Sequence, residues 1–195
     1  MMYDFLEGPI EELSPTHAVI NCGGIGFFVS ISLNTYEKIR TQKHVRLRVH
    51  LVVKEDSHSL FGFHGVDERD VFRHLISISG VGSATARMIL SSLTEKEVIQ
   101  AIISENVSLL KSVKGIGPKA AQRIVLELKD KVGKGISVSG GSGGMIHSAF
   151  QEALDALVAL GFNRLMVEKT LMKVSQDLGS EAGTEALIKN CLKLL

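Results

Sequence analysis

The sequence predicts a multidomain α+β protein, with an N-terminal β-barrel, a central all-α region and a C-terminal three-helix bundle. Three observations support this. Residues 1–64 hold short runs rich in Val, Ile, Leu and Phe with partial period-two alternation, which is typical of strands. Residues 65–133 contain one helical segment that occurs twice. Residues 148–195 carry three amphipathic helical stripes.

The N-terminal region is expected to form five strands. They cover residues 1–10, His17–Cys22, Phe27–Ile31, Val45–Val53 and Ser57–Phe63. The glycine-rich stretch 23–26 predicts a hairpin turn, and residues 32–39 predict a short helix before the fourth strand. Five strands with such an interruption suit an OB-type barrel. The stretch lacks the Gly-x-Gly-x-x-Gly spacing of a dinucleotide loop and the helix that should follow one.

An acidic pair stands at the predicted tip of the last hairpin of this barrel, where Lys54 is followed by Glu55 and Asp56. Two adjacent carboxylates on a tip are usually solvated turn residues. Taken alone, the pair favours that interpretation.

The repeated segment runs from Leu75 to Leu93 and again, 35 residues later and without a gap, from Leu110 to Leu128. Each copy joins two helices through Gly-aliphatic-Gly, at Gly80-Val81-Gly82 and Gly115-Ile116-Gly117. The first glycine can take a left-handed conformation that ends the incoming helix, and the second leaves the next helix N-terminus open. The aliphatic residue can point inward, and Pro118 suits the first position of a helix.

Such a turn presents free backbone N–H groups at the positive end of a helix dipole, which favours an anion. It resembles the helix-hairpin-helix motif, which grips DNA phosphates without reading bases. A single Gly-x-Gly is usually just a tight turn, whereas the matched pair favours DNA binding. The second copy carries the cations Lys114, Lys119, Arg123 and Lys129. The first copy carries Arg87, and has Ser83 and Ala84 where a lysine would be expected. We therefore expect the second hairpin to contribute more phosphate affinity.

Helix boundaries follow from capping residues. The bundle should hold helices ended by Gly161 and Gly179, and the apolar turn Leu160-Gly161-Phe162 is equally well explained as core or as a docking patch. Residues 134–147, rich in Gly and Ser, predict a flexible linker. The expected N-caps are Asp67, Thr94 in a capping box with Glu97, Asn106 or Ser108, Ser148, Asn163 and Thr184.

Composition excludes several classes of protein. No run of about 18 apolar residues is present, so no membrane span is expected, and the N-terminus lacks the pattern of a secretory signal. Two distant cysteines, Cys22 and Cys191, suggest reduced thiols in the cytoplasm, and no Cys/His cluster has zinc-ligand spacing. The net charge is only +1, but residues 65–134 hold eleven Lys/Arg against eight Asp/Glu. Binding would therefore rest on placed amides and a few cations.

Nearly the whole chain resembles the RuvA family, which recognises Holliday junctions in bacterial branch migration. The resemblance rests on motifs in all three regions: Gly23-Gly24-Ile25-Gly26-Phe27, Val52-Val53-Lys54-Glu55-Asp56, Leu60-Phe61-Gly62-Phe63, the two Gly-aliphatic-Gly turns with Lys119, Ala121 and Arg123, and Ala156 to Phe162. It implies a non-catalytic subunit without cofactor or metal. It also implies a homotetramer, or two face-to-face tetramers, that holds a four-way junction open in homologous recombination and DNA repair. The bundle, UBA-like in this family, would engage the hexameric RuvB ATPase, and the RuvC resolvase could join.

The resemblance also assigns roles to residues. Glu55 and Asp56 would form an acidic pin whose like charge repels phosphates at the crossover and disfavours continuous duplex. Leu160, Phe162 and Leu192 would contact RuvB. The DNA-binding set would be Lys54, Gly80, Val81, Gly82, Ser83, Arg87, Lys114, Gly115, Ile116, Gly117, Lys119 and Arg123.

The chain departs from the family pattern at four positions. Family members often carry lysine at the positions of Ala84 and Pro118, and arginine can occur where this chain has Asp4 and Glu7. The free backbone N–H groups of the two Gly-aliphatic-Gly turns remain, but the cations at these four positions are missing. A weaker salt dependence of DNA binding than in more basic members is therefore expected.

Two other functions remain to be weighed. Helix-hairpin-helix motifs also occur in DNA glycosylases and lyases, but this chain shows no comparable placement of a catalytic lysine, aspartate or four-cysteine cluster. The alternative is a general duplex or single-strand binder that serves as the scaffold of a repair complex. The absence of Trp and the presence of only two Tyr argue against a base-stacking platform.

Overall fold

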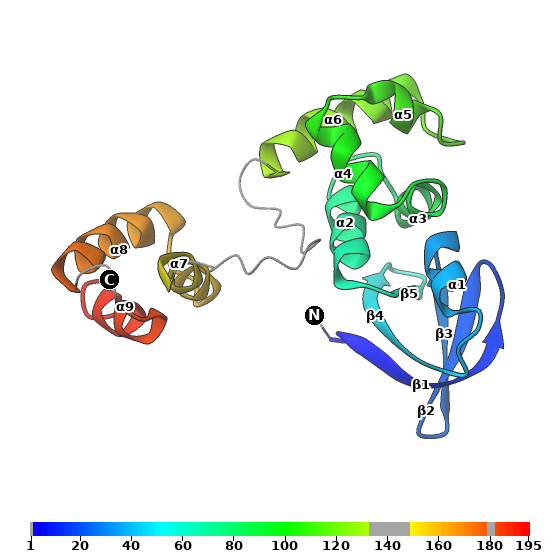
Figure 1. Ribbon diagram of the computed structural model, residues 1–195, viewed down its shortest axis with the longest axis horizontal. Helices are drawn as coiled ribbons and strands as arrows, with labels where there is room; N and C mark the ends of the chain where they lie inside the picture. The colour runs from blue at the N-terminus through cyan, green and yellow to red at the C-terminus, as the bar shows by residue number, and fades with distance from the viewer. Residues whose placement is uncertain (1, 133–148, 179–181) are drawn as a thin grey trace. The chain divides into compact units, whose positions relative to one another are not determined.

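The computed structural model describes residues 2–132, 149–178 and 182–195, without the side chains of residues 130–132 (Figure 1). The described residues form two compact units, one with the barrel and helices up to residue 132 and one with the C-terminal bundle. Three expectations lie outside the described residues: the linker at 134–147, the N-cap at Ser148 and the helix end at Gly179.

The N-terminal strands close into a barrel in the order β1-β2-β3-β5-β4. Neighbouring strands are antiparallel, except that β3 and β5 run parallel. The predicted five-stranded OB-type barrel with its helical interruption is therefore confirmed. The elements are β1 (Phe5–Leu13), β2 (His17–Cys22), β3 (Ile25–Ile31), α1 (Leu33–Ile39), β4 (His44–Val53) and β5 (His58–Phe63).

Two strands, β1 and β3, have boundaries that differ from the prediction by more than one residue. The first strand begins at Phe5 and continues to Leu13, with a shift of register between Ile10 and Glu12. The β2–β3 turn is also shorter than expected, because Ile25 pairs with Cys22 and already belongs to β3. Gly23 and Gly24 form the turn, with φ angles of +65° and +92° that suit glycine.

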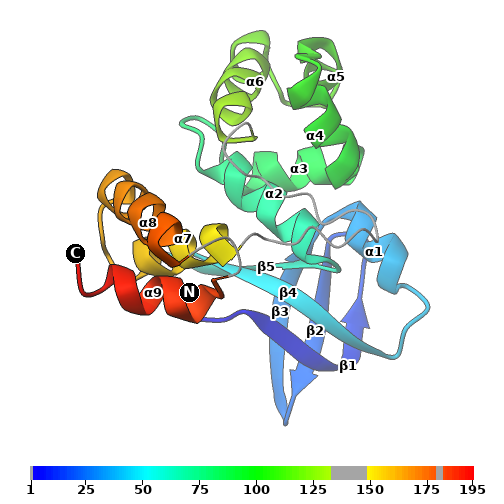
Figure 2. The ribbon, with the colours of Figure 1, turned by 60° about the vertical axis from the view of Figure 1, so that its left-hand side comes forward.

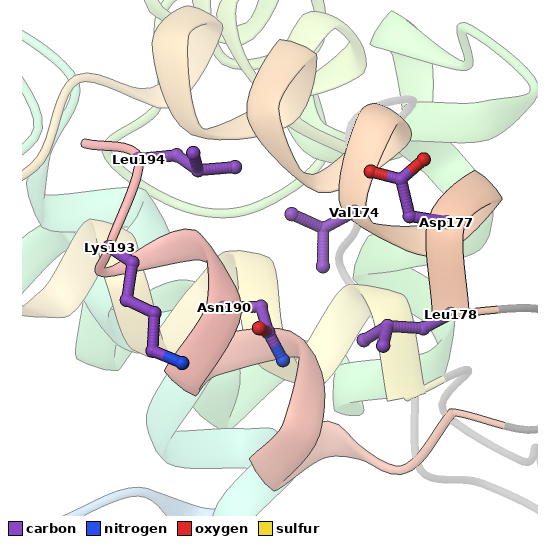
Figure 3. A pocket seen from close by; sticks show the side chains of 6 residues that line it. All are labelled: Val174, Asp177, Leu178, Asn190, Lys193 and Leu194. Atoms are coloured by element: carbon purple, nitrogen blue, oxygen red, sulfur yellow. The ribbon is translucent and has the colours of Figure 1, made fainter.

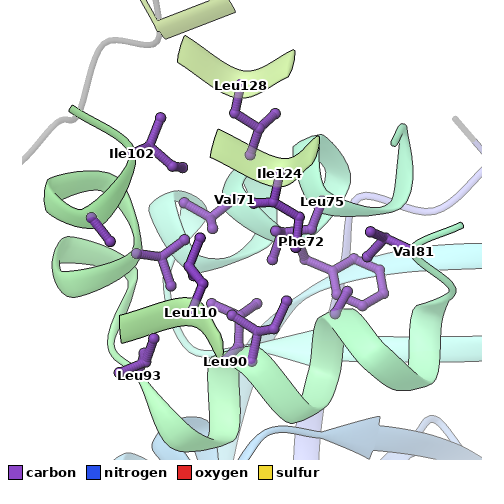
Figure 4. Close-up of a cluster of buried hydrophobic side chains, with 14 of the residues drawn as sticks. Val71, Phe72, Leu75, Val81, Leu90, Leu93, Ile102, Leu110, Ile124 and Leu128 are labelled. Atoms are coloured by element: carbon purple, nitrogen blue, oxygen red, sulfur yellow. The ribbon is translucent and has the colours of Figure 1, made fainter. Parts of the chain in front are cut away.

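Five helices follow the barrel and share a core with it. They are α2 (Val66–Ile76), α3 (Ser83–Ser92), α4 (Glu95–Ile103), α5 (Val107–Lys111) and α6 (Pro118–Val132). Their buried residues gather around Val71, Phe72 and Leu75 of α2 (Figure 4). The ring of Phe72 lies 5.0 Å from Phe61 and 4.9 Å from Phe63, both on β5, so the barrel wall forms part of this core (Figure 2).

The capping predictions for the central helices have mixed outcomes. Thr94 and Glu97 form the expected capping box, and the Asn106 side chain accepts a hydrogen bond from Leu109 N at 3.1 Å. The prediction for Asp67 is wrong. Gly65 is the N-cap of α2, with extended φ and ψ of −118° and 161°, and Asp67 lies in the first turn, where its charge still suits the helix dipole.

The C-terminal unit is the predicted three-helix bundle, with α7 (Ala149–Ala159), α8 (Arg164–Leu178) and α9 (Thr184–Cys191) around an apolar core. Asn163 caps α8 through bonds from Leu165 N and Met166 N, and Gly161 has a φ of +99°, both as expected. Thr184 is not a cap, because Gly183 takes that position. The Thr184 hydroxyl instead donates to Glu152 Oε2 at 2.7 Å, which ties α9 to α7.

Candidate nucleic-acid interface

The two Gly-aliphatic-Gly turns have the same backbone geometry. Gly80 and Gly115 both have a φ of +88°, the left-handed conformation predicted for the first glycine of each turn. The first turn joins α2 to α3, and the second joins α5 to α6. The sequence repeat is therefore a repeat of structure.

The aliphatic residue of each turn points inward, as predicted. Val81 is 5% exposed and Ile116 is 6% exposed, and both belong to the core of the helical region. Val81 N donates to the Ile78 carbonyl at 3.0 Å, and Ile116 N donates to Val113 at 3.1 Å. Each turn is thus held by one buried side chain and one backbone bond.

The second glycine of each turn leaves a helix N-terminus open. Gly82 is the N-cap of α3 and has no side-chain cap bond. Its carbonyl accepts from Ala86 N at 2.9 Å, and the Gly117 carbonyl accepts from Ala121 N at 3.0 Å. The N–H groups before Ala86 and Ala121 therefore have no partner within their helices. A Cβ built at Gly82 or Gly117 would meet nothing within 4 Å, so an anion has room to approach.

The cations of the second hairpin differ in their surroundings. Lys114 and Lys119 are exposed and form no ion pair within the described part of the chain. Arg123 is already engaged: its Nη1 donates to the Ser79 carbonyl at 3.0 Å, and its Nε lies 3.2 Å from Glu127 Oε1. Lys129, further along α6, pairs with Glu105.

Arg87, the arginine of the first copy of the repeat, is also engaged. Arg87 Nη1 donates to the Thr16 carbonyl, in the turn between β1 and β2, at 3.0 Å. Arg87 therefore connects α3 to the barrel, whereas Ser83 is half-buried at the start of α3. Lys114 and Lys119 are the more available cations, which agrees with the charge asymmetry of the two copies.

Two carboxylates near the start of the chain, Asp4 and Glu7, are paired with arginines. Asp4 lies 2.5 Å from Arg69 Nη1 and 2.6 Å from Arg48 Nη1, and Glu7 lies 3.5 Å from Arg46 Nε. The hydrogen bond from Arg69 is the largest cause of a lowered pKa for Asp4. Arginines of β4 and α2 thus compensate the negative charges of Asp4 and Glu7.

Glu55 and Asp56 occupy the exposed tip between β4 and β5. Lys54 N donates to the Ser57 carbonyl at 2.8 Å, which closes the tip, and the Ser57 hydroxyl donates to Asp56 at 3.2 Å. In the described structure neither carboxylate has an ion-pair partner. Both negative charges therefore face solvent on a short, closed turn.

The three residues expected to contact RuvB differ in exposure. Leu160 is 64% exposed and Leu192 is 45% exposed, whereas Phe162 packs against the bundle core. The turn at Leu160 is therefore part core and part surface. Sequence reasoning missed a nearby hollow of about 150 Å³ between α8 and α9, because its wall comes from two helices (Figure 3). It is lined by Val174, Asp177, Leu178, Asn190, Lys193 and Leu194.

No His, Cys, Asp or Glu cluster suited to a metal ion occurs among the described residues. Within the same residues, no helix has the length and apolar character needed to cross a membrane.

Comparisons with known proteins agree with this architecture. The model described as RuvA N terminal domain matches residues 2–62, and the model described as SAM-like Helix-hairpin-helix tandem matches residues 72–130. The model described as RuvA, C-terminal domain, matches residues 148–195.

Several full-length relatives are similar to this chain, and each is called Holliday junction branch migration complex subunit RuvA. The relative from Christiangramia forsetii is 46% identical over 194 residues, the one from Bacteroides thetaiotaomicron is 43% identical over 202 residues, and the one from Flavobacterium psychrophilum is 43% identical over 194 residues. Each alignment covers 100% of both chains. Because these relatives are at least 43% identical over their whole length, and the matched models fall in the same order along the sequence, the chain belongs to the RuvA family.

Proposed function

We propose that this chain is the non-catalytic subunit that binds four-way DNA junctions and presents them to a branch-migration motor. The observation that carries the proposal is the pair of matched turns at Gly80 and Gly115, each with an open helix N-terminus. Two such turns, each with free backbone N–H groups and both packed on one core, can hold two phosphates at a fixed spacing. Recognition through backbone amides reads the shape of the DNA and not its bases.

The acidic tip supplies the preference for a junction. Glu55 and Asp56 are exposed and have no ion-pair partner in the described structure, so they repel any phosphate placed against them. A continuous duplex crossing the tip would meet this repulsion, whereas an open crossover leaves a gap for it. The positive charge of Lys54 would offset part of the negative potential of these two carboxylates. Phosphate contacts come from the amides of both turns, with Lys114 and Lys119 as the main cations.

An apolar surface beside the tip supports assembly into a tetramer. A hollow of about 380 Å³ lies on the barrel, and Val53 and His58, which flank the tip, are among its lining residues. Phe28, at 60% exposed, and Val53, at 62% exposed, are large apolar side chains open to solvent there. Covering this surface with neighbouring copies in a four-fold ring would bring four acidic tips together at a common centre. Native mass spectrometry should show four copies of the 21.1 kDa chain.

The C-terminal bundle would recruit the RuvB ATPase, and RuvC could join the same junction. Leu160 and Leu192 offer exposed apolar contacts on the bundle, and Phe162 supports the turn from the core side. Replacing Leu160 with Ser should weaken capture of RuvB and leave junction binding intact. Loss of junction binding in that variant would contradict this separation of roles.

The test of the central proposal is competition between a synthetic four-way junction and a linear duplex of the same arm sequence. The native chain should retain the junction when duplex is in excess. Equal affinity for both DNAs would instead indicate a general duplex-binding scaffold.

A further inference from the structure

The short helix α1, inserted between β3 and β4, contacts both helices of the first hairpin. Glu68 on α2 is 1% exposed and accepts hydrogen bonds from the Ser32 hydroxyl and, at 2.8 Å, from the Thr35 hydroxyl. Ser32 is the N-cap of α1, and Thr35 lies in its first turn. A buried carboxylate from the helical region is thus held by two donors from the barrel.

The direction of these bonds is set by two backbone amides. Thr35 N donates to Ser32 Oγ at 3.0 Å, and His64 N donates to Thr35 Oγ1 at 3.1 Å. Because both hydroxyls accept from the backbone, their own protons are directed at Glu68. The position therefore suits a side chain with two acceptor oxygens, which a carboxylate provides and a carboxamide does not.

The same helix holds the end of α3. Asn34 Nδ2 donates to the carbonyls of Leu90 and Leu93, at 2.7 and 2.9 Å, and Leu33 N donates to the Ser91 hydroxyl at 3.1 Å. These bonds satisfy groups at the C-terminus of α3, which otherwise have no intrahelical partner. No such bond joins the described part of α5 or α6 to the barrel. The first hairpin is therefore fastened to the barrel, and the second is held through the first.

The buried charge at Glu68 is costly. Its pKa is raised, with burial as the largest cause, although Ser32, Thr35 and Lys38 lower it and Glu95 adds to the rise. A raised pKa means that the ionised form destabilises the fold relative to the neutral form. Removing both members of such a polar contact can leave stability unchanged or higher, so this contact is better explained by orientation than by stability.

We propose that α1 holds the first hairpin at a fixed position relative to the acidic tip. Glu68 on α2 is the principal positioning residue of this contact. This inference rests on the proposed junction-binding function. The tip is the β4–β5 hairpin, and β5 leads through His64 into α2. A loosened α1 contact would let the tip move away from DNA held in the hairpins, so that continuous duplex would no longer be repelled.

The test uses Glu68→Gln in the full chain, with Glu37→Gln as the matched control. Glu68 lies on α2, whereas Glu37 lies on α1 itself and carries the same charge. In the described structure its ion pair is with Arg40, the C-cap of α1, at 3.0 Å. Glu68→Gln should reduce the ratio of duplex to junction dissociation constants by about tenfold, the size of one lost charge-assisted hydrogen bond. The melting temperature should fall moderately, because a carboxamide offers one acceptor oxygen to two buried hydroxyl donors, and Glu37→Gln should change neither value.

A double-variant cycle distinguishes positioning from a purely structural role. In a Glu55→Gln/Asp56→Asn background, Glu68→Gln should cause no further loss of junction preference, because it acts through the tip. An equal loss in both backgrounds, or a lower melting temperature with an unchanged ratio, would overturn the inference. Asn34→Ala, which removes both bonds to α3, provides the same measurement should Glu68→Gln not fold.

The outcomes also separate this inference from the function on which it rests. A native chain without junction preference overturns both. A native preference that Glu68→Gln and Asn34→Ala retain overturns the positioning role alone.

Discussion

Arg123 Nη1 donates a hydrogen bond to the Ser79 carbonyl at 3.0 Å, so a side chain of the second hairpin holds the residue before Gly80 in the first. This bond connects the two Gly-aliphatic-Gly turns directly. We predict that Arg123→Gln weakens junction binding mainly by loosening their spacing. The slope of log K against log salt should then remain unchanged. Glu127→Gln removes only the adjacent ion pair and is the control. A slope reduced by roughly 0.9 would instead identify Arg123 as a phosphate ligand.

Lys119 and Arg87 should respond differently to truncation. Lys119 is exposed and has no ion pair within the described residues, whereas Arg87 donates to the Thr16 carbonyl. Lys119→Ala is expected to lower the salt slope by roughly 0.9 for each phosphate contact removed. Arg87→Ala should weaken binding less and leave the slope nearly unchanged. Equal losses of affinity in a side-by-side salt titration would refute this asymmetry.

The turn glycines offer a test of backbone strain. Gly80 has a φ of +88°, and a side chain there costs about 1–2 kcal/mol even though the space around it is open. Gly80→Ala should therefore lower the free energy of unfolding by that amount in urea titration. Gly82→Ala is the matched control, because Gly82 has a φ of −81° and equally open surroundings. A similar cost at both positions would show that the left-handed conformation is not the cause.

Glu68 should give the chain a specific pH dependence. Burial raises its pKa, with Lys38 on α1 opposing the rise and Glu95 on α4 adding to it. Between the unfolded and folded pKa values the folded chain binds more protons, so this group's contribution to stability increases as pH falls and is lost as pH rises. The melting temperature of Glu68→Gln relative to that of the native chain should thus be highest at neutral pH and decline in mild acid. A relative melting temperature that rises in mild acid would contradict this prediction.

Local signals in the sequence predicted much of the fold. The repeat predicted both turns because a left-handed glycine, an inward aliphatic residue and an open N-terminus are all properties of adjacent residues. The caps at Thr94 and Asn106 were predicted for the same reason. The caps at Gly65 and Gly183 carry no such signal, because a glycine has no polar side chain, and the capping pattern points instead to the polar residues Asp67 and Thr184 just after them.

The contacts that join the hairpins to the barrel and to each other could not be predicted in this way. Arg87 meets Thr16 across 71 positions of sequence, Arg123 meets Ser79 across 44, and Glu68 meets Ser32 across 36. Periodicity and capping patterns hold no information at such separations. The sequence therefore predicts which residues form the candidate interface, while the structure shows which of its cations are exposed without an ion pair and which are engaged.

The central claim is that the acidic tip makes the chain prefer an open junction to continuous duplex. The most direct measurement compares the native chain with Glu55→Gln/Asp56→Asn in competitive binding to a four-way junction and a linear duplex. Both side chains are exposed, so the substitutions should leave the fold intact. We predict that the double variant binds duplex more tightly and loses junction preference, with little change in junction affinity. Unchanged duplex affinity and an unchanged preference would contradict the account.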